Sequence, residues 1–248
     1  MQKINFEDRG ELSVTQWSLN FQKENKYFCQ PLRNTRTNEV EVLFFAHPES
    51  IRLFRKFPHV IIMDATYKTN RYDMTLVEMV GFTCTHKTFN IAYAFMAQET
   101  VMHYKFVMMC VHELCRNLGV MPKAIMTDCE KALLRAIKLV FKDTDVKQLL
   151  CWVHIKHNIQ SHAEKVIKNT KRAENFVTQC WGIFCSSTEE IYEERLRKLR
   201  DSWKKGIVGY VEKYWFTPYK KFIVRAWTDY TLHFHTRTTN KYLCLFSC

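Results

Sequence analysis

The chain has 248 residues, of which 47% are hydrophobic and 14% aromatic, with only 6 glycines and 5 prolines. Such a composition supplies core material for one large domain or two small ones, and it excludes an intrinsically disordered chain. No apolar run approaches the roughly 18 residues of a membrane span. The first ten residues are too charged for a secretory signal, so we expect no membrane partner.

The chain is basic, with 37 Lys and Arg against 25 Asp and Glu, which gives a formal net charge of +12. Residues 151–248 hold 17 of these basic and 9 of these acidic residues, a net charge of +8. A basic balance favours a polyanionic partner, nucleic acid first, over a small-molecule substrate; a merely basic soluble protein is the alternative interpretation. A phosphate-binding surface should therefore draw mainly on the second half of the chain.

The chain contains 10 cysteines and 10 histidines, and its cysteines form no Cys-x-x-Cys pair. Secreted disulfide scaffolds are shorter and denser in cysteine than this chain. Because no secretory signal is evident, we expect reduced thiols in the cytosol or the nucleus.

The first 57 residues form a mixed lead-in, in which the pattern predicts a strand over Asn38–Phe45 and a short helix over Pro48–Lys56. The pattern then sharpens. Val60–Asp64 is a continuous apolar run of the kind that forms a central strand. Leu76–Cys84 and Thr88–Met96 are β-rich runs joined by a short turn, so they predict a hairpin.

Helices and strands alternate after the hairpin. Apolar residues at helical spacing and a terminal glycine predict a helix that is closed by Gly119. The predicted elements are a helix over His103–Leu118, a strand over Pro122–Thr127, a helix over Glu130–Phe141, a strand over Gln148–Trp152 and a helix over His154–Lys168. The order β-β-β-α-β-α-β-α indicates an α/β fold, a mixed sheet flanked by helices.

An all-helical block follows from about residue 170. Helices are predicted over Ala173–Phe184, Thr188–Trp203 and Val208–Trp227, with Thr188 as a cap residue before an acidic first turn. The tryptophans of this block could contact DNA bases, but their spacing favours the core. The predicted boundaries are a lead-in over 1–57, a catalytic core over 58–168, a helical insertion over 169–237 and a remnant of the last catalytic block over 238–248.

Two aspartates follow apolar runs that predict buried strands. Asp64 ends Val60–Asp64, and Asp128 comes directly after the strand predicted over Pro122–Thr127. Carboxylates held at strand ends can share divalent metal ions, the arrangement used in phosphodiester chemistry. The alternative is that each aspartate only caps a turn or a helix, and Asp128 stands just before a predicted helix.

The residues around these aspartates resemble Mutator-like element (MULE) transposases of the DDE type. The first block is Met63–Tyr72 and the second is Ile125–Leu133, with family-like strings before, between and after them. Those further strings are Leu43–Pro48, Gly81–Thr83, Lys87–Phe95 and Cys151–Asn158. Several blocks in order at family-like spacing form a specific signal, whereas one alone would be weak.

The resemblance implies a ribonuclease H-like fold and metal-dependent DNA cleavage and strand transfer, that is, DNA transposition. Asp64 and Asp128 match two of the three acids that hold two Mg²⁺ or Mn²⁺ ions in this family. DNA is then the partner, self-association is common in such transposases, and the nucleus is the expected location. Lys68, Arg71 and Lys156 lie within the matched blocks and are the predicted nucleic-acid contacts.

Cys151 and His154 match the Cys-x-x-His element that lies close to the catalytic core in this family. Residues of this type at this spacing could also be half of a zinc site. The other half is not evident, although His157, His162, and the histidines and cysteines near the end could contribute. We therefore expect a packed cysteine and an oriented histidine rather than zinc.

The sequence departs from the family at the third acid. Arg237–Asn240 keeps the Thr-Thr-Asn of the last block, but Leu243 stands where the family has glutamate, and the chain ends five residues later. This predicts a C-terminally truncated copy, inactive as a strand transferase because leucine cannot coordinate Mg²⁺. Two alternatives are a non-enzymatic DNA-binding or transcription-regulating protein derived from a transposase, as in the plant far-red-response relatives, and a nuclease with a substitute acid. The acids considered for that substitution are Glu189, Glu190, Glu193 and Glu194.

Overall fold

The structure is a computed structural model that describes residues 27–66, 70, 72–85 and 87–230. Contacts between Cα atoms divide the chain into two compact units. Unit 1 comprises residues 1–122 and 131–145, and unit 2 comprises residues 123–130 and 146–248. Each unit is described by itself below.

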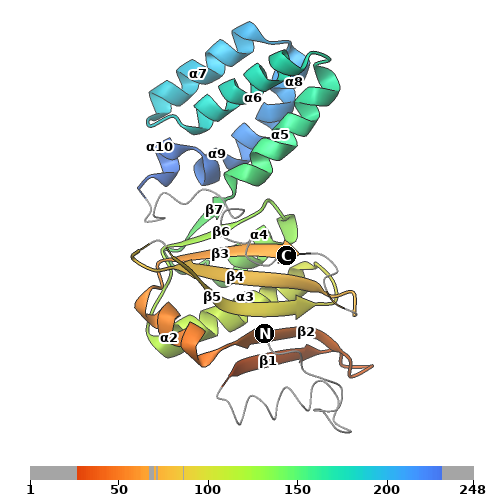
Figure 1. Cartoon of the computed structure of the whole chain (residues 1–248), viewed down its shortest axis with the longest axis vertical. Helices are drawn as coiled ribbons and strands as arrows, with labels where there is room; N and C mark the ends of the chain where they lie inside the picture. The colour runs from red at the N-terminus through yellow and green to blue at the C-terminus, as the bar shows by residue number, and fades with distance from the viewer. Residues whose placement is uncertain (1–26, 67–69, 71, 86, 231–248) are drawn as a thin grey trace. The chain divides into compact units, whose positions relative to one another are not determined.

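Among its described residues, unit 1 contains five strands, all paired antiparallel in the order β1-β2-β5-β4-β3 (Figure 1). The strands are β1 (Phe28–Arg33), β2 (Val40–Ala46), β3 (Val60–Thr66), β4 (Thr75–Phe82) and β5 (Thr88–Met96). The apolar run at the start of β3 is fully buried, as expected for a central strand. The predicted hairpin is present as β4 and β5.

The β4–β5 hairpin contains one irregularity and one close approach. Its register shifts between Met79 and Val80, two residues before Gly81. A Cβ atom at Gly81 would lie 2.7 Å from Cζ of Phe89, the residue opposite it on β5. Glycine is therefore needed at this position because the aromatic ring occupies the space of a side chain.

The described part of unit 1 has three helices: α2 (Pro48–Lys56), α3 (Val101–Leu118) and α4 (Lys131–Val140). α3 packs against β2 and α4, and α2 packs against β5. The Thr100 side chain caps α3 by accepting a hydrogen bond from the His103 amide. Gly119 ends α3 in the left-handed conformation, with φ 65°, as the sequence predicts.

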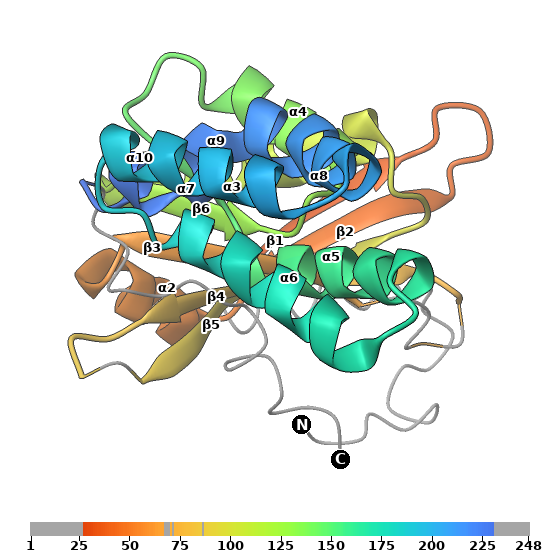
Figure 2. The same cartoon turned by 90° about the horizontal axis from the view of Figure 1, so that it is seen from above.

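Unit 2 begins with a parallel strand pair, β6 (Ala124–Thr127) and β7 (Lys147–Leu150). Its helices are α5 (Trp152–Val166), α6 (Thr170–Phe184), α7 (Glu189–Ser202), α8 (Lys205–Val211), α9 (Thr217–Ile223) and α10 (Arg225–Thr228), with the π-helical turn η2 (Glu212–Phe216) between α8 and α9. α6 packs against both α5 and α7, and Figure 2 shows α5 and α6 side by side. Thr188 caps α7 as expected, accepting a hydrogen bond from the Ile191 amide at 3.3 Å.

The α/β class, with both antiparallel and parallel strands, is confirmed. Two predictions were wrong. β1 was missed, because Pro31 and its partly polar neighbours hide the strand pattern. The single helix predicted over Val208–Trp227 is instead α8, η2, α9 and α10, with Val224 extended between the last two. Within the described ranges, no helix has the length and apolar character needed to cross a bilayer.

Candidate metal and nucleic-acid site

Asp64 lies in β3 of unit 1, where the fully buried part of the strand gives way to half-exposed residues. Its direct partner on β4 is Glu78, and the direct partner of Glu78 on β5 is Tyr93. Residues directly opposite each other on antiparallel strands project to the same face of a sheet. The three side chains therefore form a row across three neighbouring strands.

Glu78 is the functional candidate that sequence reasoning missed. It is only 8% exposed, which is unusual for a glutamate. Burial raises the pKa of Glu78, and the charge of Asp64 raises it further. Burial likewise raises the pKa of Tyr93, and the neighbouring Glu78 charge adds to this, whereas a hydrogen bond with Asn90 opposes it.

The turn that follows Asp64 is organised by Asn70, another residue of the first family block. The Asn70 side-chain amide donates to the Met74 carbonyl at 2.6 Å. Its oxygen accepts from the Tyr72 and Met74 amides at 3.1 and 3.3 Å. A single side chain thus holds together the turn that leads into β4, the strand that carries Glu78.

Asp128 lies in unit 2, directly after β6 and three residues before α4 begins. Its carboxylate accepts a hydrogen bond from the Glu130 amide at 3.3 Å, and its carbonyl accepts one from the Thr127 hydroxyl at 2.7 Å. This hydrogen bond agrees in part with the alternative interpretation, in which Asp128 caps the turn before the helix. Asp64 and Asp128 belong to different units, so their sharing of metal ions stays a prediction.

Cys151 and His154 open α5 of unit 2. Cys151 is fully buried at the N-cap position, makes no capping hydrogen bond with its side chain and donates its amide to the Thr127 carbonyl at 2.8 Å. His154 is half-buried one turn further on. Trp152, between them, donates Nε1–H to the Ile223 carbonyl at 2.8 Å and so joins α5 to the end of α9.

Tyr219 of α9 reaches the residue after Asp128, a contact that sequence spacing could not reveal. Its hydroxyl is hydrogen-bonded to the Cys129 thiol. Burial raises the pKa of Tyr219 to about 12, and the hydrogen bond and the Cys129 charge contribute to the rise. Helix α9 therefore buttresses the turn that carries Asp128 within unit 2.

Of the predicted nucleic-acid contacts, Lys156 is exposed on α5, with Nζ 5.4 Å from the centre of the Trp181 ring. Such lysine–aromatic pairs recur in unit 2, with Lys213 at 5.2 Å over Tyr214 and Lys220 at 4.9 Å over Trp227. Trp215 is buried, as expected of a core residue, whereas Trp181, Trp203 and Trp227 are half-buried. Lys68, Arg71 and Leu243 lie outside the described residues.

The substitute acids considered from the sequence lie on α7 in unit 2. Glu189 is 3.6 Å from Lys220, and Glu194 is 2.6 Å from Lys198, in ion pairs at the surface. Thr188 lowers the pKa of Glu190 by hydrogen bonding. These carboxylates thus have nearby basic or hydroxyl partners in unit 2, whereas Asp64 belongs to unit 1.

Within the described ranges, no group of three or more His, Cys, Asp or Glu side chains is arranged to hold a metal ion. The pair of Asp64 and Glu78 is smaller than such a group, but its oxygen donors match what Mg²⁺ and Mn²⁺ prefer. Mg²⁺ is commonly held by one or two carboxylates with water and substrate phosphates in its remaining positions. The residues present therefore fit a hard divalent cation at Asp64.

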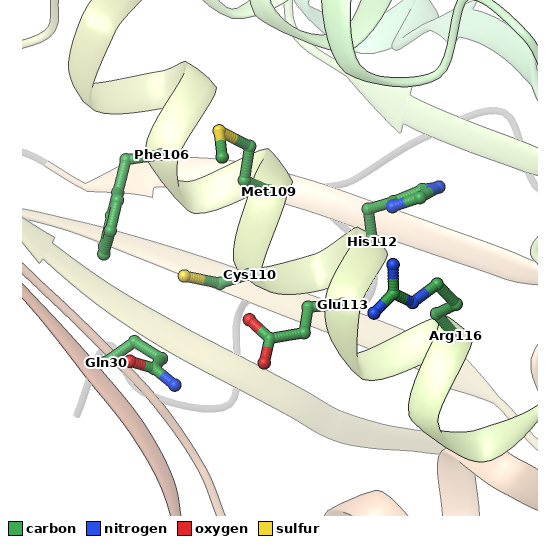
Figure 3. Close-up of a pocket in the computed structure, with 7 residues that line it drawn as sticks. All are labelled: Gln30, Phe106, Met109, Cys110, His112, Glu113 and Arg116. Atoms are coloured by element: carbon green, nitrogen blue, oxygen red, sulfur yellow. The ribbon is translucent and has the colours of Figure 1, made fainter.

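A separate pocket of about 320 Å³ lies in unit 1 along α3 (Figure 3). Gln30 of β1 faces six residues of α3 across it, and these are Phe106, Met109, Cys110, His112, Glu113 and Arg116. None of the predicted site residues lines this pocket. It therefore adds nothing to the candidate metal site.

Comparison of the sequence with known proteins gives two relatives of limited coverage. Protein FAR1-RELATED SEQUENCE 5 of Arabidopsis thaliana is 25% identical over 170 residues, which are 64% of this chain and 21% of that protein. PKS-NRPS hybrid synthetase cheA of Chaetomium globosum is 28% identical over 115 residues, 46% of this chain and 2% of that protein. The chain thus spans only a small part of either relative.

Among solved structures, the HTLV-2 integrase catalytic core domain in complex with magnesium resembles this chain weakly. Its trimeric form has a TM-score of 0.27 and 16% identity, and covers 48% of this chain and 81% of the integrase chain. The dimeric form has a TM-score of 0.28, and its match covers 49% of this chain and 83% of the integrase chain.

The model of the MULE transposase domain family matches residues 60–158, a stretch that begins at β3 and ends within α5. The match contains Asp64, Asp128, Cys151 and His154. Residues 60–158 of this chain are therefore a MULE transposase domain, as the motifs predict.

Proposed function

We propose that this chain is a transposase-derived DNA-binding protein with a ribonuclease H-like core and a helical insertion after it. The observation that carries the proposal is the MULE transposase domain over residues 60–158, with an aspartate in β3 and another directly after β6. The net charge of +12 supports a DNA partner, and the family supports a nuclear location and self-association.

In this proposal Asp64 and Asp128 would hold Mg²⁺ or Mn²⁺, which when bound would supply activation of the attacking oxygen and stabilisation of the leaving one. The chain's own contribution is to fix the two carboxylates. Pairing of β3 with β4 holds Asp64 within the sheet, and the Glu130 amide donates a hydrogen bond to the Asp128 carboxylate. With Leu243 at the position of the third acid, we propose that strand transfer is lost while DNA binding remains.

A plasmid-nicking assay with Mn²⁺ tests the loss of activity. We expect no nicking by the wild-type chain, by Asp64→Asn or by Asp128→Asn. Metal-dependent nicking by the wild type that disappears in Asp64→Asn would show that the chain is an active nuclease. In the same assay, Leu243→Glu asks whether the missing carboxylate is the main defect, and we expect it to restore some nicking.

A non-enzymatic DNA-binding or regulatory role is the second candidate. The match to Protein FAR1-RELATED SEQUENCE 5 favours it, because that match extends over 170 residues and so beyond the 60–158 domain. It predicts the same inactivity towards DNA strands but no gain from Leu243→Glu. Nicking by that variant therefore separates the two candidates.

DNA binding itself is measured by titration in EDTA at several salt concentrations. Each phosphate contact contributes about −0.9 to the slope of log K against log salt. Lys68→Ala, Arg71→Ala and Lys156→Ala should each make the slope shallower by about this amount. Lys142→Ala is the matched control, since its ammonium is 3.7 Å from Asp143 at the surface of unit 1 and the resemblance gives it no role. Equal slopes for all four variants would contradict the predicted contacts.

A further inference from the structure

Two carboxylates stand directly opposite each other in the sheet of unit 1. Antiparallel pairing places Asp64 of β3 beside Glu78 of β4, with their side chains on one face. Like charges at directly opposite positions destabilise a sheet. The pairing therefore gathers two carboxylates on one face of unit 1.

Burial makes this arrangement more costly. Glu78 is more than nine-tenths buried, and no hydrogen bond or ion pair to its carboxylate is formed within the described residues. Burial of the side chain to this degree disfavours its charged form, in keeping with the raised pKa of Glu78. The residue opposite Glu78 on β5 is Tyr93. A tyrosine side chain carries no positive charge, so it cannot form an ion pair with the Glu78 carboxylate.

Two other carboxylates of unit 1 have hydrogen-bond partners, in contrast to Glu78. Glu41 accepts a hydrogen bond from the Asn34 amide at 2.8 Å and is 3.7 Å from Nε2 of His103. Glu99 accepts from the Thr75 hydroxyl at 3.0 Å and from the Tyr104 hydroxyl at 3.4 Å. Glu78 differs from both in that its charged neighbour is another carboxylate.

We propose that Glu78 is, with Asp64, a carboxylate ligand of a divalent cation on this face of unit 1. Mg²⁺ and Mn²⁺ suit the site because two carboxylates suffice when water and DNA phosphate oxygens fill the other positions. The inference rests on the proposed function in that Asp64 is taken as a metal ligand. It assigns a further ligand, besides Asp128, to a residue of the strand next to β3, independently of position 243.

The test is a titration of the full chain with Mn²⁺, in which free Mn²⁺ is followed by electron paramagnetic resonance. Glu78→Gln and Asp64→Asn should each weaken binding about 10-fold or more, because loss of even an outer-shell partner costs about 10- to 100-fold. Glu41→Gln is the matched control, a carboxylate of the same sheet with protein partners, and should bind Mn²⁺ like the wild type. Wild-type affinity in Glu78→Gln, or no binding by the wild-type chain, would overturn the proposal.

Thermal unfolding separates loss of the ligand from loss of the fold. In EDTA, Glu78→Gln should melt at or above the wild-type temperature, because the repulsion from Asp64 is gone. Mn²⁺ should raise the melting temperature of the wild type more than that of Glu78→Gln, because the variant binds Mn²⁺ more weakly. An equal Mn²⁺ shift in both proteins would contradict the inference.

DNA binding in EDTA needs no cation and is measured on the same variants. Failure to bind DNA would refute the proposed function while leaving the Glu78-dependent Mn²⁺ affinity intact. Normal DNA binding with no effect of Glu78→Gln on Mn²⁺ affinity would refute only the cation site.

Discussion

Single residues of the candidate site differ in how far the sequence could reveal them. Asp64 and Asp128 stand in family blocks next to apolar runs, so local pattern was sufficient to find them. Glu78 became visible only through the β3–β4 register, and a slip of one residue would turn it to the other face. Tyr219 contacts Cys129 across 90 residues of sequence, a distance over which no local pattern carries information.

Trp152 supplies a test at the scale of a single hydrogen bond. The last carbonyl groups of α9 have no partners within the helix. The carbonyl of the fully buried Ile223 accepts a hydrogen bond from Nε1–H of Trp152. Trp152→Phe should therefore cost about 1–3 kcal/mol, the penalty for an unsatisfied buried acceptor. Urea unfolding followed by circular dichroism measures the loss.

Trp203→Phe is the control for the change in ring size. Its Nε1–H donates to the Gln179 side chain at 2.9 Å in a half-buried position, where water can replace it. We expect a smaller loss than for Trp152→Phe. A larger one would mean that the ring contacts outweigh the hydrogen bond to Ile223.

At the scale of elements, the sequence predicted those whose signal is strong and local. The buried run of β3, the β4–β5 hairpin and the Thr188 cap were all recognisable, and the structure contains them. The prediction of one long helix over Val208–Trp227 was wrong, because apolar spacing does not reveal the π-helical turn or the extended Val224. These two irregularities depend on tertiary packing. The Ala226 amide, just after Val224, donates a hydrogen bond to the carbonyl of the distant Ser186 at 2.8 Å.

Two glycines in helical context should respond to alanine in opposite directions. Gly119 has φ 65°, where a Cβ atom is disfavoured, so Gly119→Ala should destabilise by about 1 kcal/mol. Gly209 lies inside α8 with nothing within 4 Å of a new Cβ, so Gly209→Ala should stabilise by about 0.5–1 kcal/mol. Thermal melting of both variants checks the signs, and a shared sign would refute the conformational argument.

At the scale of the whole molecule, buried cysteines report on each unit separately. Cys115 is fully buried in unit 1 and Cys180 is buried in unit 2, whereas Cys84 is exposed. At pH 8 a thiol reagent should label Cys84 at once, and Cys115 and Cys180 only as their units open. Peptide mass spectrometry over a time course measures the order. Labelling of Cys115 as fast as Cys84 would contradict the described packing.

The same thiols make stability depend on pH on the alkaline side. Burial raises the pKa of Cys115 to about 12, against about 8.5 in an unfolded chain. The unfolded state therefore releases this proton first, so the stabilisation is complete below about pH 8.5 and declines as pH rises towards 12. The urea midpoint should fall between pH 8 and 10. Cys115→Ala should reduce this fall, and an unchanged pH dependence would exclude the thiol as a cause.

The division of the chain between its units has a consequence for biosynthesis. The chain enters unit 2 at residue 123, returns to unit 1 at residue 131 and leaves it again at residue 146. Neither unit is one uninterrupted stretch of sequence, so a single protease cut cannot release either one whole. During translation, β6 emerges before α4 but waits for β7, its parallel partner, which is made later. Completion of unit 2 must therefore follow that of unit 1 on the ribosome, and an early stop after residue 122 would leave both unfinished.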